Sequence, residues 1–528
     1  MSTVELRFHK YRYFPYEEQL AELEAERLLG VSPERVNGSL YVEAQPGLDL
    51  PALERLTYFQ DAIVPEVGNI TTQQAKLEAS ATSHGNPNQL RRQQTRYSAH
   101  GLHEYRGKFN PQMVRATCNL LGLRTGARVW DPFCGSGTVL LEARHQGFDA
   151  LGTDLNPLAV TIANAKLSAI EADPATLGLA VDDTRHYVEE RTRTLVEGNP
   201  SRREFEQILG RSWLDGLPCA EFLSRWFPMP VLAQLAVILD AIDRVVPLHL
   251  RGVFRVVLSD ILRQVSWQDP GDLRVRRRRE PSPNYPAASI FLSALCARVG
   301  TVIAAQEFTS PRRGWQEAFL GDSCSMTGLG ETPLKFLEDG VDCVLSSPPY
   351  ATALPYIDTQ RLSIAILGLA SVQEIRQLDA TLVGSREVST VERQEVEQSI
   401  VSHGADVACE VRSLCQSLLD AYDPSLDGFR RRNTAAVVFR YFTGMTGMMR
   451  AAAKAVRTGG CLAFIVGPNR AKLGGTSFLI DTPGLLAATG VHVGLRVSDV
   501  HELNAYNRYS IHSRNSIREE RLLILQKQ

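Results

Sequence analysis

The sequence predicts an α/β fold with a mostly parallel sheet, an antiparallel strand near the C-terminus and large helical insertions. Two short apolar segments, 127–131 and 150–154, are each followed by a helical segment, which is the pattern of a parallel βαβ unit. Apolar strands at 318–321 and 341–345 resume this pattern after a long helical interruption. We therefore expect one sheet whose strands are spread widely along the chain.

Length and composition are those of a globular protein with more than one core. The chain has 528 residues, of which 44% are hydrophobic and 22% are charged. One hydrophobic core rarely serves so many residues. The formal net charge of −2 gives no general positive field, so a nucleic acid would have to bind local basic residues.

The sequence also bears on compartment and metal binding. The N-terminus lacks the apolar core of a signal peptide, and no run of about 18 apolar residues predicts a membrane span. The nine cysteines are scattered without a C-x-x-C pair, which argues against a zinc site and a disulfide framework. We expect a cytoplasmic protein without a membrane contact or a bound metal.

Four regions are predicted along the chain. They are an N-terminal accessory region at 1–95, a first core part at 96–170, a helical insertion at 171–315 and a second core part at 316–528. In the first region, Pro15 favours a helix start and Gly30 a helix end, whereas the composition of 70–96 is that of a polar linker.

The two core parts are predicted in more detail. In the first, helices at 138–146 and 158–167 follow the two strands, and Gly147 is suited to end the earlier helix. In the second, another helical insertion covers about 357–456, and 461–466 is a buried strand. Segments 491–497 and 522–525 are expected to form the final antiparallel pair.

A glycine-rich turn joins strand 127–131 to the helix that follows it. Its residues are Asp131-Pro132-Phe133-Cys134-Gly135-Ser136-Gly137-Thr138. Glycines let the backbone turn sharply and approach a ligand closely, and the helix start presents free N–H groups. Asp154 ends the next strand, where an acid can bind ribose hydroxyls. The pattern predicts a nucleotide-like cofactor at this edge of the sheet.

A second turn, Ser347-Pro348-Pro349-Tyr350, follows strand 341–345. Two adjacent prolines fix the backbone and remove two N–H donors, which leaves carbonyl groups free to accept hydrogen bonds. An amine that is to be methylated has this requirement, because its protons must be held while its lone pair faces the methyl group. Such alignment supplies much of the catalysis.

Together the two turns resemble motifs I and IV of the S-adenosylmethionine-dependent DNA amino-methyltransferases, the N4-cytosine/N6-adenine family. The resemblance covers about 97–170 and 315–350 well, and 455–528 loosely. It implies a class I, Rossmann-like methyltransferase fold. It also implies that motif I holds S-adenosylmethionine through Asp131, Phe133, Gly135, Gly137 and Thr138, while Asp154 binds the ribose.

Two further segments resemble motifs of the same family. Lys108-Phe109-Asn110-Pro111 is similar to motif X, which implies that Phe109 packs on the methionine part of the cofactor. Phe319-Leu320-Gly321-Asp322 is similar to motif III, which implies that Asp322 binds the adenine.

By the resemblance of Ser347-Pro348-Pro349-Tyr350 to motif IV, the Ser347 hydroxyl and the Pro348 carbonyl bind the target amine. Tyr350 then stacks on a base that is rotated out of the duplex. No strong base is needed, because the cofactor's methyl group is already activated. Serine in the first position is commoner among cytosine-N4 enzymes and Asp or Asn among adenine-N6 enzymes, so cytosine N4 is favoured.

The partner predicted by this resemblance is DNA, and a restriction–modification or defence system could supply cognate partners. Local basic residues in the first insertion, a possible target-recognition region, are Arg274, Arg276, Arg277 and Arg278. They either contact phosphates or form a solvated surface.

Other functions stay open. Adenine N6 is one alternative target. Segment 109–121 and the motif after it also look like tRNA guanine-N2 methyltransferases, although the catalytic loop of those enzymes usually begins with Asp, where this chain has Ser347. A catalytically inactive nucleic-acid-binding module is a third alternative.

Overall fold

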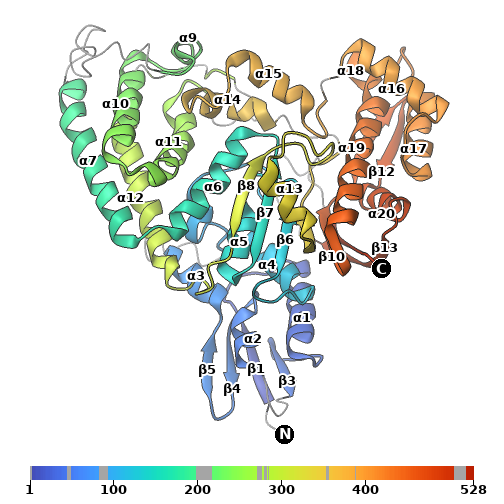
Figure 1. Cartoon of the computed structure of the whole chain (residues 1–528), viewed down its shortest axis with the longest axis horizontal. Helices are drawn as coiled ribbons and strands as arrows, with labels where there is room; N and C mark the ends of the chain where they lie inside the picture. The colour runs from blue at the N-terminus through green and yellow to red at the C-terminus, as the bar shows by residue number, and fades with distance from the viewer. Residues whose placement is uncertain are drawn as a thin grey trace.

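The structure is a computed structural model of the whole chain. It describes residues 3–43, 49–82, 93–197, 217–269, 276–278, 282, 285–351, 356–386, 388–504 and 519–528. Figure 1 shows a central sheet with an N-terminal domain below it, a helical bundle on one side and a C-terminal lobe on the other.

The central sheet has seven strands in the order β13-β14-β10-β9-β6-β7-β8. Their bounds are β6 (Arg128–Asp131), β7 (Asp149–Asp154), β8 (Gln316–Leu320), β9 (Val341–Ser346), β10 (Val456–Val466), β13 (Arg496–Asn504) and β14 (Glu519–Gln526). The strands from β8 to β10 pair in parallel, and β14 runs antiparallel to both β10 and β13. The expected α/β fold with an antiparallel C-terminal strand is confirmed.

Helices α4 (Pro111–Leu120), α5 (Thr138–Gln146) and α6 (Pro157–Glu171) lie next to one another and pack against one face of the parallel part of the sheet. Helix α5 ends at Gly147 as expected, and the positive φ of 73° at this residue suits glycine. Side chains alternate between the two faces of the sheet. Val129 and Ala150 belong to the core shared with the N-terminal domain, and Trp130 and Leu151 belong to the core shared with the C-terminal lobe.

The first insertion is a helical bundle. Its helices are α7 (Pro174–Glu197), α9 (Ala220–Ser224), α10 (Met229–Val245), α11 (Arg251–Val265) and α12 (Ala287–Gln306). Within the described part of the chain, α12 is the one helix long and apolar enough to cross a membrane. It packs against α7, α10 and α11, and a core helix of a bundle has the same composition.

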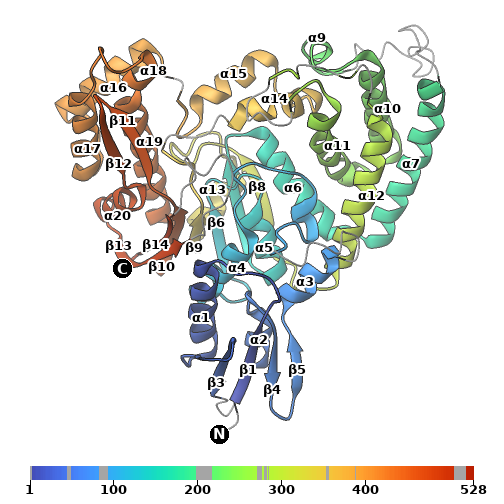
Figure 2. The ribbon, with the colours of Figure 1, turned by 180° about the vertical axis from the view of Figure 1, so that it is seen from behind.

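The second insertion begins after the Ser347 turn. It contains α14 (Tyr356–Ile366), α15 (Val372–Thr381), α16 (Thr390–Ser402), α17 (Cys409–Asp420), α18 (Phe429–Arg432) and α19 (Thr434–Ala455), and helix α13 (Glu331–Glu338) lies before β9. Figure 2 shows α14 and α15 beside the helical bundle, whereas α16 to α19 belong to the C-terminal lobe.

The C-terminal lobe corrects one expected strand. A hairpin, β11 (Asn469–Leu473) and β12 (Thr476–Ile480), is followed by helix α20 (Thr482–His492). The strand expected at 491–497 is therefore wrong at its start, because α20 extends through His492 and β13 begins at Arg496. Pro483 in the first turn favours the helix, and Val491 is exposed rather than buried in the sheet.

The N-terminal domain is a five-stranded antiparallel sheet that the sequence did not reveal. Its strands, in spatial order, are β2 (Glu34–Val36), β3 (Ser39–Glu43), β1 (Thr3–Phe8), β4 (Phe59–Val64) and β5 (Gly68–Thr71). Helices α1 (Pro15–Leu29) and α2 (Leu50–Arg55) belong to this domain. The expected helix from Pro15 to Gly30 is confirmed, and Gly30 has a φ of 71°.

The polar linker expected at 70–96 is wrong over helix α3 (Gln73–Thr82). Several of its polar side chains, among them Gln74 and Glu78, are buried and paired instead of solvated. Gln74 Nε2 donates to Glu78 Oε1 over 2.8 Å, and Gln112 Nε2 of α4 donates to the same oxygen over 3.1 Å. Leu77, which lies between Gln74 and Glu78 along the helix, is fully buried. The helix therefore packs tightly against its neighbours.

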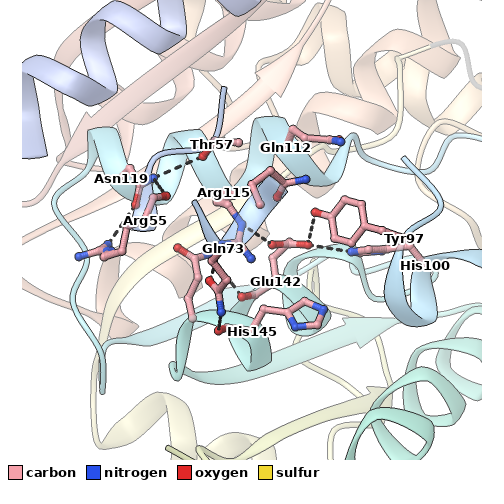
Figure 3. A network of polar contacts seen from close by, with 12 residues as sticks. Arg55, Thr57, Gln73, Tyr97, His100, Gln112, Arg115, Asn119, Glu142 and His145 are labelled. Carbon is pink, nitrogen blue, oxygen red and sulfur yellow. Dashed lines mark hydrogen bonds and ion pairs between the residues drawn. The ribbon is translucent and has the colours of Figure 1, made fainter. Parts of the chain in front are cut away.

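A buried polar network fixes the N-terminal domain to the core (Figure 3). Its centre is Glu142 of α5, whose carboxylate accepts from Tyr97 Oη over 2.6 Å and from Arg115 Nε over 3.0 Å. His100 Nε2 lies 2.8 Å from the same carboxylate. Arg115 continues the network to Gln73 Oε1 of α3 over 2.6 Å. The N-terminal domain and the core are therefore joined by specific hydrogen bonds in a region with little solvent.

A second set of bonds joins α1 to α4. Glu24 accepts from the backbone N–H groups of Thr57 and Tyr58 over 2.8 and 3.1 Å, and from Asn119 Nδ2 over 3.0 Å. Burial raises the pKa of Glu24 above its usual value. Because the domains share these bonds and one apolar core, they form a continuous unit.

Replacing Glu142 with alanine is expected to lower the free energy of unfolding by about 3–5 kcal/mol, because Arg115 would remain buried without its carboxylate. The measurement is urea unfolding. The matched control is Glu338→Ala on the exposed side of α13, which should change the free energy by less than about 0.5 kcal/mol. Equal effects of the two substitutions would show that the network does not stabilise the fold.

Candidate functional site

A pocket of about 700 Å³, part of it open to solvent, lies at the edge where the parallel strands end. Parallel strands bring their carboxyl ends to one edge, so the turns after β6, β7, β8 and β9 meet there. Six residues predicted from the sequence line this pocket, namely Phe133, Gly135, Asp154, Asp322, Ser347 and Pro349. Asp131, Gly137, Thr138, Pro348, Tyr350 and Phe109 are not in its lining.

Helix α6 supports the glycine turn through two contacts. Gly137 has a φ of 73°, and a Cβ added there would lie 2.6 Å from the Cβ of Ala163 on α6. The glycine thus permits α5 and α6 to pack closely. Lys166 of α6 donates from Nζ to the carbonyl of Ser136 over 2.7 Å, and burial lowers the pKa of Lys166 to about 7. Gly137 acts on the shape of the turn and does not line the pocket.

Asp154 folds the same turn over the end of β7. Its Oδ2 accepts from the Gly135 N–H over 2.9 Å, and its Oδ1 accepts from the Asn156 N–H over 2.8 Å. Burial raises the pKa of Asp154 to about 6. Each carboxylate oxygen has a second lone pair, so the group can also accept hydrogen bonds from ligand hydroxyls in the pocket.

Asp131 links the two predicted motifs. Its Oδ1 accepts from the Phe133 N–H over 3.1 Å and from the Ser346 hydroxyl over 2.6 Å. Burial raises the pKa of Asp131 to about 7. The carboxyl group is buried behind the pocket, so it positions the glycine turn and the Ser347 turn relative to each other instead of contacting a ligand.

The Ser347 turn presents two residues to the pocket. Among the residues that the structure describes, no hydrogen bond occupies the Ser347 hydroxyl, which is therefore available to a ligand. Pro348 is buried. Tyr350 donates from its hydroxyl to Glu520 Oε1 of β14 over 2.8 Å, so this ring is anchored to the antiparallel strand.

Asp322 stands at the far end of the pocket, after the edge strand β8. Its Oδ1 accepts from the Cys324 N–H over 2.9 Å, and the Ser325 hydroxyl donates to its Oδ2. A backbone bond from the Asp322 N–H to the Thr327 carbonyl, 2.8 Å long, closes the loop. The loop holds the carboxylate in place with part of its surface in the pocket.

Phe109 does not line the pocket. It packs, partly buried, against the core shared by α4 and the N-terminal domain. Asn110 caps α4 by accepting from the N–H groups of Gln112 and Met113 over 2.9 and 3.2 Å. The aromatic residue of this segment that lines the pocket is Tyr105, whose Cε1 lies 3.4 Å from where a Cβ on Gly135 would be.

Seven lining residues lie outside the predicted motifs, namely Tyr105, Gly107, Leu155, Asn156, Ser323, Leu382 and Val383. Asn156 has a recognisable signal, since it follows Asp154 by two residues and precedes a proline. Its Nδ2 donates to Gln360 Oε1 of α14 over 2.6 Å and to the Tyr105 hydroxyl over 3.3 Å. Leu382 and Val383 have no signal of this kind, because they lie in the second insertion.

The arginines of the predicted cluster differ in exposure and in their contacts. Arg276 and Arg277 are exposed, and the Arg277 guanidinium lies 4.4 Å from the ring centroid of Trp267. Arg278 donates from Nε to the Gln268 carbonyl over 2.8 Å, so its group belongs to the local fold. Arg274 lies outside the described residues. None of the three described arginines lines the pocket, and their contact with phosphate remains a prediction.

Comparison with known proteins identifies one region of the chain. Residues 102–194 match the family model described as RMKL-like, methyltransferase domain. This segment holds the glycine turn, Asp154 and Tyr105. Among solved structures, TrmN from Thermus thermophilus aligns over 100% of both chains with 11% identity and a TM-score of 0.30, which is too low to support an argument.

Three curated relatives are similar to parts of the chain. The type II methyltransferase M.MvaI of Kocuria varians is 25% identical over 55% of this chain and 63% of its own length. M.BsoBI of Geobacillus stearothermophilus is 24% identical over 53% and 55%. A tRNA (guanine(10)-N2)-dimethyltransferase of Methanothermobacter thermautotrophicus is 40% identical over only 10% and 16%. The chain thus spans less than two thirds of the length of each relative, and the family match covers residues 102–194 alone.

Proposed function

We propose that the protein transfers a methyl group from S-adenosylmethionine to an exocyclic amino group of a nucleic-acid base, with cytosine N4 in DNA as the favoured target. One observation carries this proposal. The glycine turn with Asp154 and the Ser347 turn line the same pocket, and the Asp131–Ser346 bond joins them across 215 residues of sequence. A cofactor site and an amine-binding turn are thereby adjacent.

The residues present fit the cofactor. Asp154 can accept from the ribose hydroxyls and Asp322 from the adenine amino group, while Phe133, Gly135 and Tyr105 surround the remainder of the pocket. When bound, S-adenosylmethionine supplies an activated methyl group.

The Ser347 turn would then align the target amine. The Ser347 hydroxyl accepts a hydrogen bond from one amine proton and the Pro348 carbonyl from the other, so that the nitrogen lone pair points toward the cofactor. Tyr350, fixed by Glu520, offers an aromatic ring beside this turn for a base rotated out of a duplex. The Asp131–Ser346 bond maintains the distance between the two turns.

The choice of DNA and of cytosine N4 rests on narrower grounds. Serine at position 347 favours cytosine N4 over adenine N6, and two relatives are named type II methyltransferases, which supports a restriction–modification role with a cognate partner in the cytoplasm. The second candidate is a tRNA guanine-N2 methyltransferase. It is favoured by the short segment that is 40% identical to such an enzyme.

The decisive test of substrate is to express the protein in a host without DNA methylation and to analyse its DNA and tRNA by mass spectrometry. Ser347→Ala should lower the rate of methyl transfer by at least about 100-fold, since the amine loses a partner in the reactive geometry. Its cofactor affinity should stay within twofold of the wild type in calorimetry.

The matched control is Ser413→Ala on the exposed face of α17. N4-methylcytosine in DNA is the expected product. Detection of N6-methyladenine would mean that adenine N6, and not cytosine N4, is the target. N2-methylguanine in tRNA would favour the second candidate, and the absence of any methylated base would overturn the proposal.

Cofactor binding also depends on Gly137. Gly137→Ala should weaken S-adenosylhomocysteine binding by at least about tenfold, because the new Cβ would lie 2.6 Å from Ala163 and displace the glycine turn. Gly459→Ala is a suitable control. Its φ of 81° is also positive, but nothing lies within 4 Å of the added Cβ. Similar affinities in both variants would mean that Gly137 does not shape the cofactor site.

If Arg276 and Arg277 contact phosphates, reversing both charges should weaken DNA binding and reduce the slope of log K against log salt by about one to two. Arg278 is excluded because its guanidinium supports the local fold. Arg313→Glu, at a side chain that is 78% exposed, is the control for a general change of charge. An unchanged slope would make this cluster ordinary surface.

A further inference from the structure

One wall of the pocket comes from neither cofactor motif nor catalytic turn. Leu382 and Val383 follow helix α15 in the second insertion and line the pocket together with Asp322 and Ser347. We propose that this insertion completes the cofactor site, with Val383 packing on the face of the adenine ring. The inference rests on the proposed function, because it assumes S-adenosylmethionine as the ligand.

Helix α19 places Val383 at the Asp322 end of the pocket. A methyl group added at Gly444 would lie 3.4 Å from Cys324 Sγ and 4.0 Å from Val383 Cγ2. The two side chains therefore meet over the same glycine. Cys324 follows Asp322 by two residues, and Asp322 follows the edge strand β8, three strands from the β9 that carries Ser347. Val383 thus lies on the side of the pocket away from the target amine.

A second glycine of α19 fixes the Asp322 loop. A Cβ at Gly447 would lie 2.3 Å from the carbonyl oxygen of Cys324, so the helix and this loop touch through their backbones. Only glycine allows so close an approach without displacing the loop. One turn of α19 therefore supports both the acid that is expected to bind adenine and the apolar residue opposite it.

The turn that carries Val383 is also anchored to α19. Arg440 donates from one terminal nitrogen to the Ser385 carbonyl over 2.5 Å, and the other terminal nitrogen pairs with Glu392 over 2.6 Å. The Ser385 N–H donates to the Leu382 carbonyl over 3.0 Å, which closes the turn. These bonds fix the wall before a ligand arrives, and such preorganisation favours binding.

The chemistry of this corner suits a purine. An adenine ring has flat apolar faces and a polar edge, so it needs an apolar side chain over a face and an acceptor at its amino group. Val383 and Leu382 supply the first, and the Asp322 carboxylate supplies the second. The target base is served instead by Ser347, Pro349 and the neighbouring Tyr350.

The test compares ligands that carry the adenosine part of the cofactor with a DNA ligand, which would bind on the target-base side of the pocket. Val383→Ala should weaken the binding of S-adenosylhomocysteine and of adenosine by the same factor, about three- to tenfold, as expected for the loss of apolar contacts. DNA affinity, measured with a duplex oligonucleotide, should not change. Val391→Ala, at an exposed valine of α16, is the matched control and should leave all affinities unchanged.

A backbone variant tests the support given by α19. Gly447→Ala should weaken S-adenosylhomocysteine binding at least tenfold, whereas Gly178→Ala in α7, where nothing lies within 4 Å of the added Cβ, should not. Circular dichroism of each variant verifies that it is folded. If Gly447→Ala does not fold, Val383→Ala and a Val383→Asp variant still decide the question.

The outcomes separate the two proposals. If the wild-type protein binds no S-adenosylhomocysteine, the proposed function fails. If it binds with an affinity that Val383→Ala leaves unchanged, only the present inference fails. A loss of DNA affinity with intact cofactor affinity would also overturn the inference, because Val383 would then belong to the target-base side.

Discussion

The hydrogen bond from the Ser346 hydroxyl to Asp131 is the contact on which the site depends. Strands β6 and β9 are neighbours in the sheet, but nothing in their pairing fixes the turns that leave them. The buried carboxyl group of Asp131 does so by accepting from both turns, with Phe133 N–H on one side and Ser346 on the other. Burial of a carboxyl group is costly unless it is hydrogen-bonded, so this arrangement strongly disfavours any shift of one turn against the other. The bonds of Asp131 thus help to set the shape of the pocket.

The sequence predicted the parts of the fold whose signals are local. Strands β6 and β7 with helix α5 lie within a short βαβ unit, and fully buried parallel strands give apolar runs that are easy to identify. The N-terminal sheet gives a weaker signal, since buried residues alternate with partly exposed ones in β1 and β3, all three residues of β2 are exposed and β5 has no buried residue. The composition of helix α3 predicts a linker because glutamines are usually solvated, although Gln74 is buried and paired with Glu78 and the partly buried Gln73 is paired with Arg115. A polar composition therefore predicts a solvent-exposed segment only where the polar side chains have no hydrogen-bond partners inside the protein.

The candidate site likewise contains some residues that the sequence could predict and others that it could not. Gly135, Asp154 and Ser347 follow buried strands directly, so their position at the edge of the sheet could be inferred from the chain alone. Tyr105 could not be distinguished from Phe109, because both belong to one short segment and only the packing of the core decides which ring faces the pocket. Gly444 and Gly447 give no pattern that separates them from other helical glycines. Their significance appears only when the Cys324 loop is found against α19.

The topology explains why the second insertion, and not the first, borders the pocket. The chain leaves β7 through α6, which returns to the opposite edge of the sheet before the first insertion begins at α7. The second insertion begins directly after the Ser347 turn, at the carboxyl edge, and the chain crosses back only through α19, which leads into β10. Residues inserted there start beside the site, and α19 serves at once as the crossover helix and as the support of both pocket loops. No described residue of the first insertion lines the pocket, but α11 contacts α14, so the helical bundle lies beside the segment that follows the Ser347 turn.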